Sequence, residues 1–227
     1  MTHLPDIETE NIIFKSSPNF IQLRSMFKSA AHLNQHGDFS NINWLNTPGP
    51  IYTTTTDNCG TGQTEAVNNV SGDKDYCEII FKQPVNFKEL EETISAAICD
   101  PFGSYYFDGN QNWNFENIIT WYNQSEDRIN YIVDRYREEL RLPLHQPHIC
   151  SWKIGNEIFT GQLYGPPKSV PENYKSWLDF YQFGLKNYLE WYVYQLESRK
   201  VNLPSLNYDW TIKDELDSYL KRNFLSK

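Results

Sequence analysis

The spacing of apolar residues predicts a chain built mainly from helices. Apolar side chains recur every three or four positions in several stretches, which is the repeat of an amphipathic helix. The predicted helices are 18–34, 86–99, 115–123, 126–142, 171–199 and a final helix that starts at Thr211. The stretch 171–199 is the longest, and its broad aromatic stripe is typical of a face buried in a protein core.

Residues at the predicted helix starts support these boundaries. Asn86 precedes the second helix and Glu89 follows three residues later, which approximates a capping box. Asn114 and Thr211 stand at the starts of two later helices, where a short polar side chain accepts a bond from a free backbone N–H group. Each of these helices therefore has a defined start in the sequence.

A few stretches have the composition of β-strands. Residues 76–81 form a partly alternating apolar run that ends before Pro84, and the alternation places Glu78 on the outward face. The β-branched residues 53–56 favour an extended segment. Together with the helices, these segments predict an α+β fold that is predominantly α-helical with a small β-sheet.

The helical pattern is interrupted near residue 145. Prolines break it there, and residues 150–161 then predict a hairpin around a Gly-Asn turn at 155–156. We expect residues 1–145 to form an α+β core with two ordered loops. We expect residues 146–227 to form a hairpin and a helical C-terminal part that packs on this core.

Composition and charge indicate which kinds of partner the chain can bind. Of 227 residues, 39% are hydrophobic and 15% are aromatic, which is enough apolar surface for a folded chain. Twenty basic residues against 29 acidic residues give a formal net charge of −9. An acidic surface repels nucleic acid and anionic membranes and attracts partners with a basic surface. We therefore expect neither a nucleic acid partner nor membrane association.

The sequence shows no targeting or membrane-spanning signal. The first ten residues are polar and acidic, without a positively charged start or an apolar run. No stretch approaches the roughly 20 apolar residues that a membrane span needs. We expect a cytoplasmic protein with reduced thiols.

Metal-binding patterns are incomplete. The four cysteines at 59, 77, 99 and 150 contain no C-x-x-C pair, which excludes zinc-ribbon and iron–sulfur spacing. His32 and His36 are four residues apart, but Leu33 stands where an H-E-x-x-H site has glutamate. The run 108–110 retains only a fragment of an EF-hand loop. We expect neither a metal nor a cofactor.

Two loops rich in glycine, proline and aromatic residues are the candidate binding segments. The first spans 44–62 and the second spans 100–113. Aromatic residues interleaved with Asp and Asn give each loop a large contact area with polar groups. Five residues are the predicted partner contacts: Asp57, Asp100, Tyr105, Tyr106 and Asp108.

The sequences of these loops resemble a known family. The segments that carry the resemblance are 44–52 (WLNTPGPIY), 56–62 (TDNCGTG), 79–84 (IIFKQP) and 100–103 (DPFG), with Asp108-Gly109-Asn110 and Trp113. They resemble a bacterial family whose members are often labelled ferredoxin, although this chain lacks the cysteine spacing of a ferredoxin. The resemblance covers residues 44–122 and implies immunity proteins encoded near secreted toxins.

Two functional hypotheses follow. The first is an immunity protein that binds a cognate toxin domain and masks its active site, which requires no catalytic residue. The alternative is a small hydrolase in which Asp57, Asp108, Cys59 and a histidine converge in the loops around 57–62 and 100–110. The sequence contains no coherent catalytic set, which favours the first hypothesis and leaves enzymatic activity an open question.

Overall fold

The computed structural model describes residues 3–11, 37–140, 148–154, 157–163 and 169–225. The predicted helix at 18–34, with the pair His32 and His36, lies outside the described residues.

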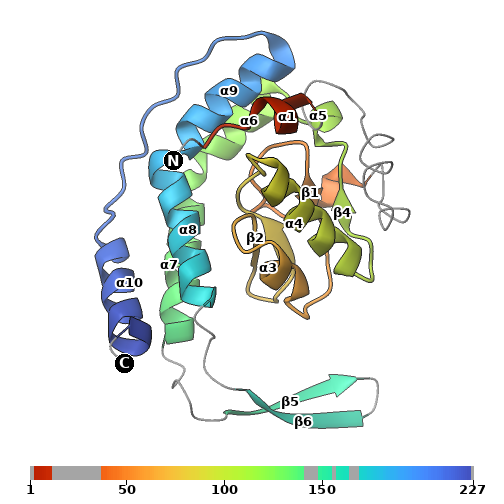
Figure 1. Cartoon of the computed structure of the whole chain (residues 1–227), viewed down its shortest axis with the longest axis vertical. Helices are drawn as coiled ribbons and strands as arrows, with labels where there is room; N and C mark the ends of the chain where they lie inside the picture. Colours follow the sequence, from red (N-terminus) through yellow and green to blue (C-terminus); the bar gives the residue numbers. More distant parts are fainter. Residues whose placement is uncertain (1–2, 12–36, 141–147, 155–156, 164–168, 226–227) are drawn as a thin grey trace.

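The fold is α+β and predominantly helical, as the apolar spacing predicts (Figure 1). The helices are α1 (Ile7–Thr9), α3 (Thr61–Glu65), α4 (Phe87–Cys99), α5 (Gly109–Asn112), α6 (Phe115–Asn123), α7 (Ser125–Leu140), α8 (Ser169–Phe183), α9 (Leu185–Glu197) and α10 (Ile212–Leu220), with a 3-10 turn at Phe39–Asn41 and a π-helical turn at Lys221–Leu225. The strands are β1 (Tyr52–Thr53), β2 (Val70–Gly72), β3 (Glu78–Ile80), β4 (Tyr105–Tyr106), β5 (His148–Ile154) and β6 (Glu157–Leu163).

Short antiparallel ladders form the β structure of the described residues. The pairs are β1–β4, β2–β3 and β5–β6. The first two ladders are joined by side chains. The Thr53 hydroxyl donates to the Glu78 carbonyl at 2.7 Å, and the buried Asn46 Oδ1 accepts from the N–H groups of Thr53 (3.2 Å) and Ile80 (2.9 Å). One buried asparagine therefore connects β1 to β3.

The predicted helix starts at Asn86, Asn114 and Thr211 are confirmed, but the cap bond expected from the Thr211 side chain is not formed. Asn86 and Asn114 begin α4 and α6, and each Oδ1 accepts the N–H group three residues further on at 2.9 Å. Thr211 precedes α10 but makes no side-chain cap bond. Instead, Asp209 Oδ1 accepts the Thr211 N–H at 3.1 Å, so a different residue binds the backbone there.

The prediction of a single helix over 171–199 is wrong. The structure has two helices, α8 and α9, which change direction at Gly184 (Figure 1). Gly184 has φ −121° and ψ −38°, outside the α-helical range. A Cβ at this position would lie 2.6 Å from Cγ of His3, so the N-terminal segment occupies the space that a side chain would need.

The C-terminal helices share a hydrophobic core with residues from the first half of the chain. Phe81, next to β3, stacks on Trp177 of α8 with ring centroids 5.6 Å apart, and both are fully buried. The buried Tyr188 hydroxyl of α9 donates to the Pro48 carbonyl at 3.0 Å. A second, smaller core lies under α4 and includes Ile51, Val70, Ile80, Leu90 and Ile94.

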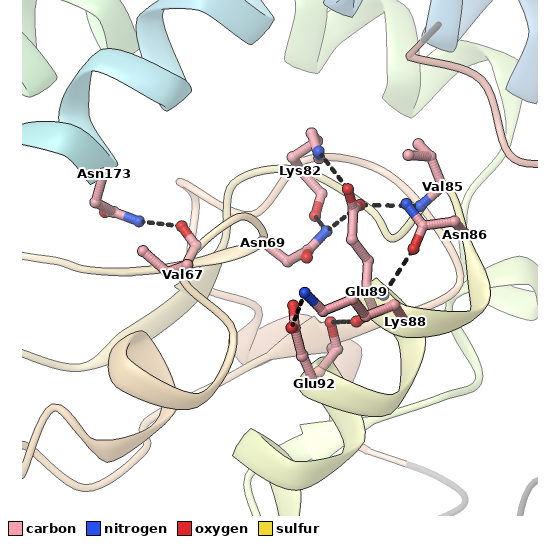
Figure 2. Close-up of polar contacts among 10 residues, drawn as sticks. Val67, Asn69, Lys82, Val85, Asn86, Lys88, Glu89, Glu92 and Asn173 are labelled. Atoms are coloured by element: carbon pink, nitrogen blue, oxygen red, sulfur yellow. Dashed lines mark hydrogen bonds and ion pairs between the residues drawn. The ribbon is translucent and has the colours of Figure 1, made fainter. Parts of the chain in front are cut away.

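Polar contacts hold α8 and α4 to the turn before β2 (Figure 2). The fully buried Asn173 of α8 donates from Nδ2 to the carbonyls of Val67 (2.8 Å) and Val70 (2.9 Å). The Glu89 carboxylate of α4 accepts three bonds, each at 3.1 Å, from Lys82 Nζ, Asn69 Nδ2 and the Val85 N–H. The Lys82–Glu89 ion pair is largely buried, and hydrogen bonds satisfy both of its carboxylate oxygens.

The predicted hairpin is confirmed. Strand β5 pairs with β6 in a register that places Trp152 opposite Phe159. In Figure 1 the hairpin extends away from the helices and the other ladders.

Candidate functional site

The two loops that the sequence singles out lie side by side and are joined by hydrogen bonds. The Thr54 N–H donates to the Ser104 carbonyl at 3.1 Å, and the Ser104 hydroxyl donates to the Thr55 carbonyl at 2.6 Å. The loops also meet backbone to backbone. The Gly109 N–H donates to the Pro50 carbonyl at 3.0 Å, and a Cβ at Gly109 would collide with the Gly49 carbonyl oxygen. The two loops therefore form one structural unit.

Asp100 binds the backbone of both loops. Its carboxylate accepts the N–H groups of Asp57 (3.2 Å), Phe102 (3.3 Å) and Ser104 (2.6 Å). Asp57 Oδ1 in turn accepts the Cys59 N–H at 3.1 Å. These are charge-assisted bonds between a carboxylate and backbone donors, and they fix the conformation of both loops.

Glu78 was expected on the outward face of its strand, and this prediction is wrong. Its side chain is 1% exposed, and its carboxylate accepts from the Gly62 N–H (2.6 Å) and the Tyr105 hydroxyl (2.7 Å). Gly60, the cap residue of α3, has no side chain to bind the first N–H groups of that helix. Glu78 of β3 takes this role by accepting the Gly62 N–H. Its negative charge is favourable at the N-terminus of a helix.

Burial controls the ionisation of this cluster. It raises the pKa of the Glu78 carboxyl, an effect that the bonds from Tyr105 and Gly62 counteract and that the charges of Asp57 and Asp100 reinforce. Burial and the adjacent Glu78 also raise the pKa of Tyr105 well above its ordinary value. The Tyr105 hydroxyl therefore remains a proton donor to Glu78 at physiological pH.

Asp108 and Tyr106 lie in a second group, around Tyr52. Asp108 Oδ2 accepts the Gly37 N–H at 3.4 Å, and the Tyr52 and Tyr106 rings are 5.4 Å apart. Burial raises the pKa of Tyr52, and the neighbouring Asp108 carboxylate adds to this effect.

The structure thus separates the five predicted contact residues into two groups. Asp57, Asp100 and Tyr105 surround Glu78, whereas Asp108 and Tyr106 surround Tyr52. Exposure is 8% for Asp57, 5% for Asp100 and Asp108, and 1% for Tyr105, while Tyr106 is half-buried. Their direct contact with a partner stays a prediction. The bonds described here give four of them an internal role in holding the loops.

The outer surface of the paired loops is formed by other residues. We define the loop face as the exposed residues Thr55, Asn58, Cys59, Pro101 and Phe102. Phe102 is the largest of them and is 68% exposed. It precedes Gly103, whose φ of +63° is a conformation that glycine adopts without strain. The sequence signal for Phe102 is the Pro-Phe-Gly turn, which places an aromatic residue at the tip of a loop.

The hydrolase arrangement is only partly assembled. Cys59 lies beside Asp57, and the charge of this aspartate raises the pKa of the thiol. A nucleophilic cysteine needs a lowered pKa or an adjacent base, so the environment works against activation. His3, a histidine whose side chain is described, packs against Phe180, with ring centroids 5.9 Å apart. Among the described residues, no His, Cys, Asp and Glu side chains form a group that could hold a metal ion.

Arg128 of α7 is a second buried charged residue, and it is 1% exposed. Its guanidinium lies 4.2 Å from the Trp121 ring and 5.2 Å from the Trp44 ring. Nε donates to the Trp44 carbonyl at 2.7 Å, so Arg128 fixes the start of the first loop to α7. Burial lowers the pKa of Arg128 to about 10, which leaves it charged at neutral pH.

None of the described helices has the length and apolar character that crossing a membrane requires. No protein-family model matches the chain, and neither the curated proteins nor the solved structures give a match. The family resemblance of residues 44–122 therefore stays an expectation.

Proposed function

We propose that this chain is an immunity protein that binds a cognate toxin domain through the loop face and covers the toxin's active site. The observation that carries the proposal is the construction of that face. Buried carboxylates fix the backbone of two loops, while Phe102 at their tip is left 68% exposed. A rigid surface that presents an exposed aromatic residue has the features of an interface hot spot.

The charge of the chain favours a basic partner. With a formal net charge of −9, the molecule attracts a positively charged protein and repels nucleic acid. An inhibitor that covers an active site must bind the toxin tightly and fit its surface, but it needs no catalytic group. The raised pKa of Cys59 supports a binding role for the loops over a catalytic one.

The test uses the product of the adjacent gene as the candidate toxin. Co-expression with the wild-type chain should restore growth, and calorimetry with an inactivated toxin should show a stoichiometric, salt-sensitive complex. Phe102→Ala should weaken binding about tenfold or more, because the largest apolar contact of the face is lost.

The matched control is Phe183→Ala. Phe183 is also an exposed phenylalanine, at 61%, but it lies at the end of α8 outside the loop face. It should bind the toxin as the wild-type chain does. The absence of any complex with the wild-type chain would overturn the proposed function, whereas equal binding by both variants would overturn the assignment of the loop face.

A further inference from the structure

Tyr76 has a backbone conformation that its side chain disfavours. Its φ is +63°, and among the described residues Ser198 is the other non-glycine residue with a positive φ. A bulky residue in this region is an outlier, because the Cβ approaches the backbone carbonyl. Glycine or asparagine would adopt the same turn more readily. The tyrosine side chain is nevertheless 54% exposed, so burial in the core does not account for its presence.

The surrounding turn holds this conformation rigidly. We define the Tyr76 turn as residues 73–77. Asp73 Oδ1 accepts the N–H groups of Asp75 and Cys77, each at 2.9 Å, and the Asp73 carbonyl accepts the Tyr76 N–H at 3.0 Å. The Lys74 N–H donates to the Tyr131 hydroxyl of α7 at 2.6 Å, which fastens the turn to the helix. These hydrogen bonds therefore hold the backbone of Tyr76 in a single conformation.

Trp44 lies at the same corner of the molecule. The Nδ2 of the preceding residue, Asn43, donates to Asp73 Oδ2 at 2.9 Å. The Trp44 ring contacts the Tyr131 ring edge to face, with centroids 5.6 Å apart. Trp44 is 45% exposed although its ring and carbonyl are both held by Arg128. Two exposed aromatic side chains thus flank one hydrogen-bonded centre at Asp73.

The Tyr76 turn is attached to the segment that carries the loop face. Thr56 connects them, since its hydroxyl accepts the Glu78 N–H at 2.6 Å and its carbonyl is 3.7 Å from the Cys77 thiol. The next residue of the loop face, Thr55, accepts the Ser104 hydroxyl. Thr56 is itself 3% exposed, so these bonds attach the Tyr76 turn, beneath the surface, to the segment that carries Thr55.

The charges at the corner indicate what it binds. Asp75 is highly exposed, and its ion pair with the equally exposed Lys74 is long, at 3.8 Å. Such a pair is weak in water and leaves the Asp75 carboxylate accessible. Aromatic faces next to a carboxylate suit a guanidinium or ammonium group, which combines cation–π contact with charge pairing.

We infer that the Tyr76 turn, together with Trp44, is the anchor of the toxin interface and receives an arginine or lysine side chain of the toxin. This inference rests on the proposed function and names the chemistry of the partner. The strained tyrosine is retained because it binds, and its exposed ring supplies a preorganised contact.

The experiment measures stability and affinity on the same variant. Tyr76→Gly removes the ring and relieves the positive φ. Its thermal midpoint should equal or exceed that of the wild-type chain, while its affinity for the inactivated product of the adjacent gene should fall about tenfold or more. Tyr76→Phe restores the ring and should recover most of the lost affinity.

Charge reversal tests the chemistry of the partner. Asp75→Lys should weaken binding and reduce its salt dependence, whereas Glu91→Lys, at an exposed acid on α4, should leave affinity unchanged. If the wild-type chain forms no complex, the proposed function fails and the inference falls with it. If the wild-type chain and Tyr76→Gly bind equally well, the inference is overturned while the proposed function stands. Unchanged binding by Asp75→Lys would overturn the assignment of a basic side chain.

Discussion

At the scale of single residues, the charged side chains with internal roles are those that bind backbone groups far away in sequence. Glu78 is buried because it binds Gly62 and Tyr105, and Arg128 is buried because it binds Trp44, 84 residues earlier. Glu78 supplies the missing cap of α3, and Arg128 attaches the start of the first loop to α7. A buried charge is tolerated under those conditions, since hydrogen bonds compensate part of its desolvation.

Replacing Glu78 with glutamine should change how stability depends on pH. Because burial raises the folded-state pKa of Glu78, its contribution is full below the ordinary value of 4.5 and is lost as the pH rises through the folded-state value. Glutamine does not ionise; its amide oxygen can accept the Gly62 N–H, and its amide nitrogen would donate to the Tyr105 oxygen, which reverses the bond that Tyr105 makes to Glu78. The free energy of unfolding of Glu78→Gln, relative to wild type, should therefore increase between acidic and neutral pH.

Urea denaturation at a series of pH values measures this difference. The control is Glu116→Gln, at an exposed residue of α6, which should give a profile parallel to wild type. A parallel profile for Glu78→Gln would contradict the prediction.

These residues also mark what the sequence could and could not predict. The caps Asn86 and Asn114 were predictable because the cap and its bonded N–H group are three residues apart. The alternating pattern around Glu78 carries no information about Gly62 or Tyr105, which approach only in the folded chain. The composition of the two loops predicted that they are binding segments. It could not show that their aspartates bind backbone groups inside the fold, or that Phe102 is the aromatic residue left exposed.

At the scale of elements, the break between α8 and α9 has no clear sequence signal. Tyr181, Leu185 and Tyr188 continue the same apolar repeat across it, and all three are buried. A single glycine within a helical pattern is often tolerated, so the pattern predicts one helix. The break becomes understandable only with His3, which packs against Gly184 from the opposite end of the sequence.

A double-mutant cycle tests this contact. Gly184→Ala should destabilise the protein by about 1–3 kcal/mol, because the new Cβ would overlap the His3 ring. Adding His3→Ala should remove most of that loss, since it opens the space that the Cβ needs. Guanidinium denaturation of the four proteins gives the coupling free energy. Simple additivity of the two substitutions would show that His3 does not occupy this position.

At the scale of the whole molecule, the C-terminal helices are fastened to the first half by both apolar and polar contacts. Phe81 and Trp177 stack in the shared core, and Asn173 binds the carbonyls before and within β2. Tyr192 adds a third link, because its hydroxyl donates to Asn110 in the second loop at 2.8 Å. The second half of the chain therefore packs against the loop region and stabilises it.

Substitutions at Asn173 should weaken this attachment in a defined order. Asn173→Ala leaves the carbonyls of Val67 and Val70 without their donor and should cost about 1–3 kcal/mol. Asn173→Asp should cost more, because a carboxylate would face those two carbonyl oxygens in a buried site. Chemical denaturation followed by fluorescence compares the two. An aspartate variant as stable as the alanine variant would contradict the assigned orientation of the amide.

The backbone contact between Gly49 and Gly109 has a consequence for how such a protein changes during evolution. Because the two loops touch without intervening side chains, an insertion or a larger residue in one of them displaces the other. Their lengths should therefore vary together among descendants of this sequence. Under the proposed function, new partner specificity would arise by exchange of outward residues such as Phe102 and Tyr76, while the lengths of the two loops stay matched.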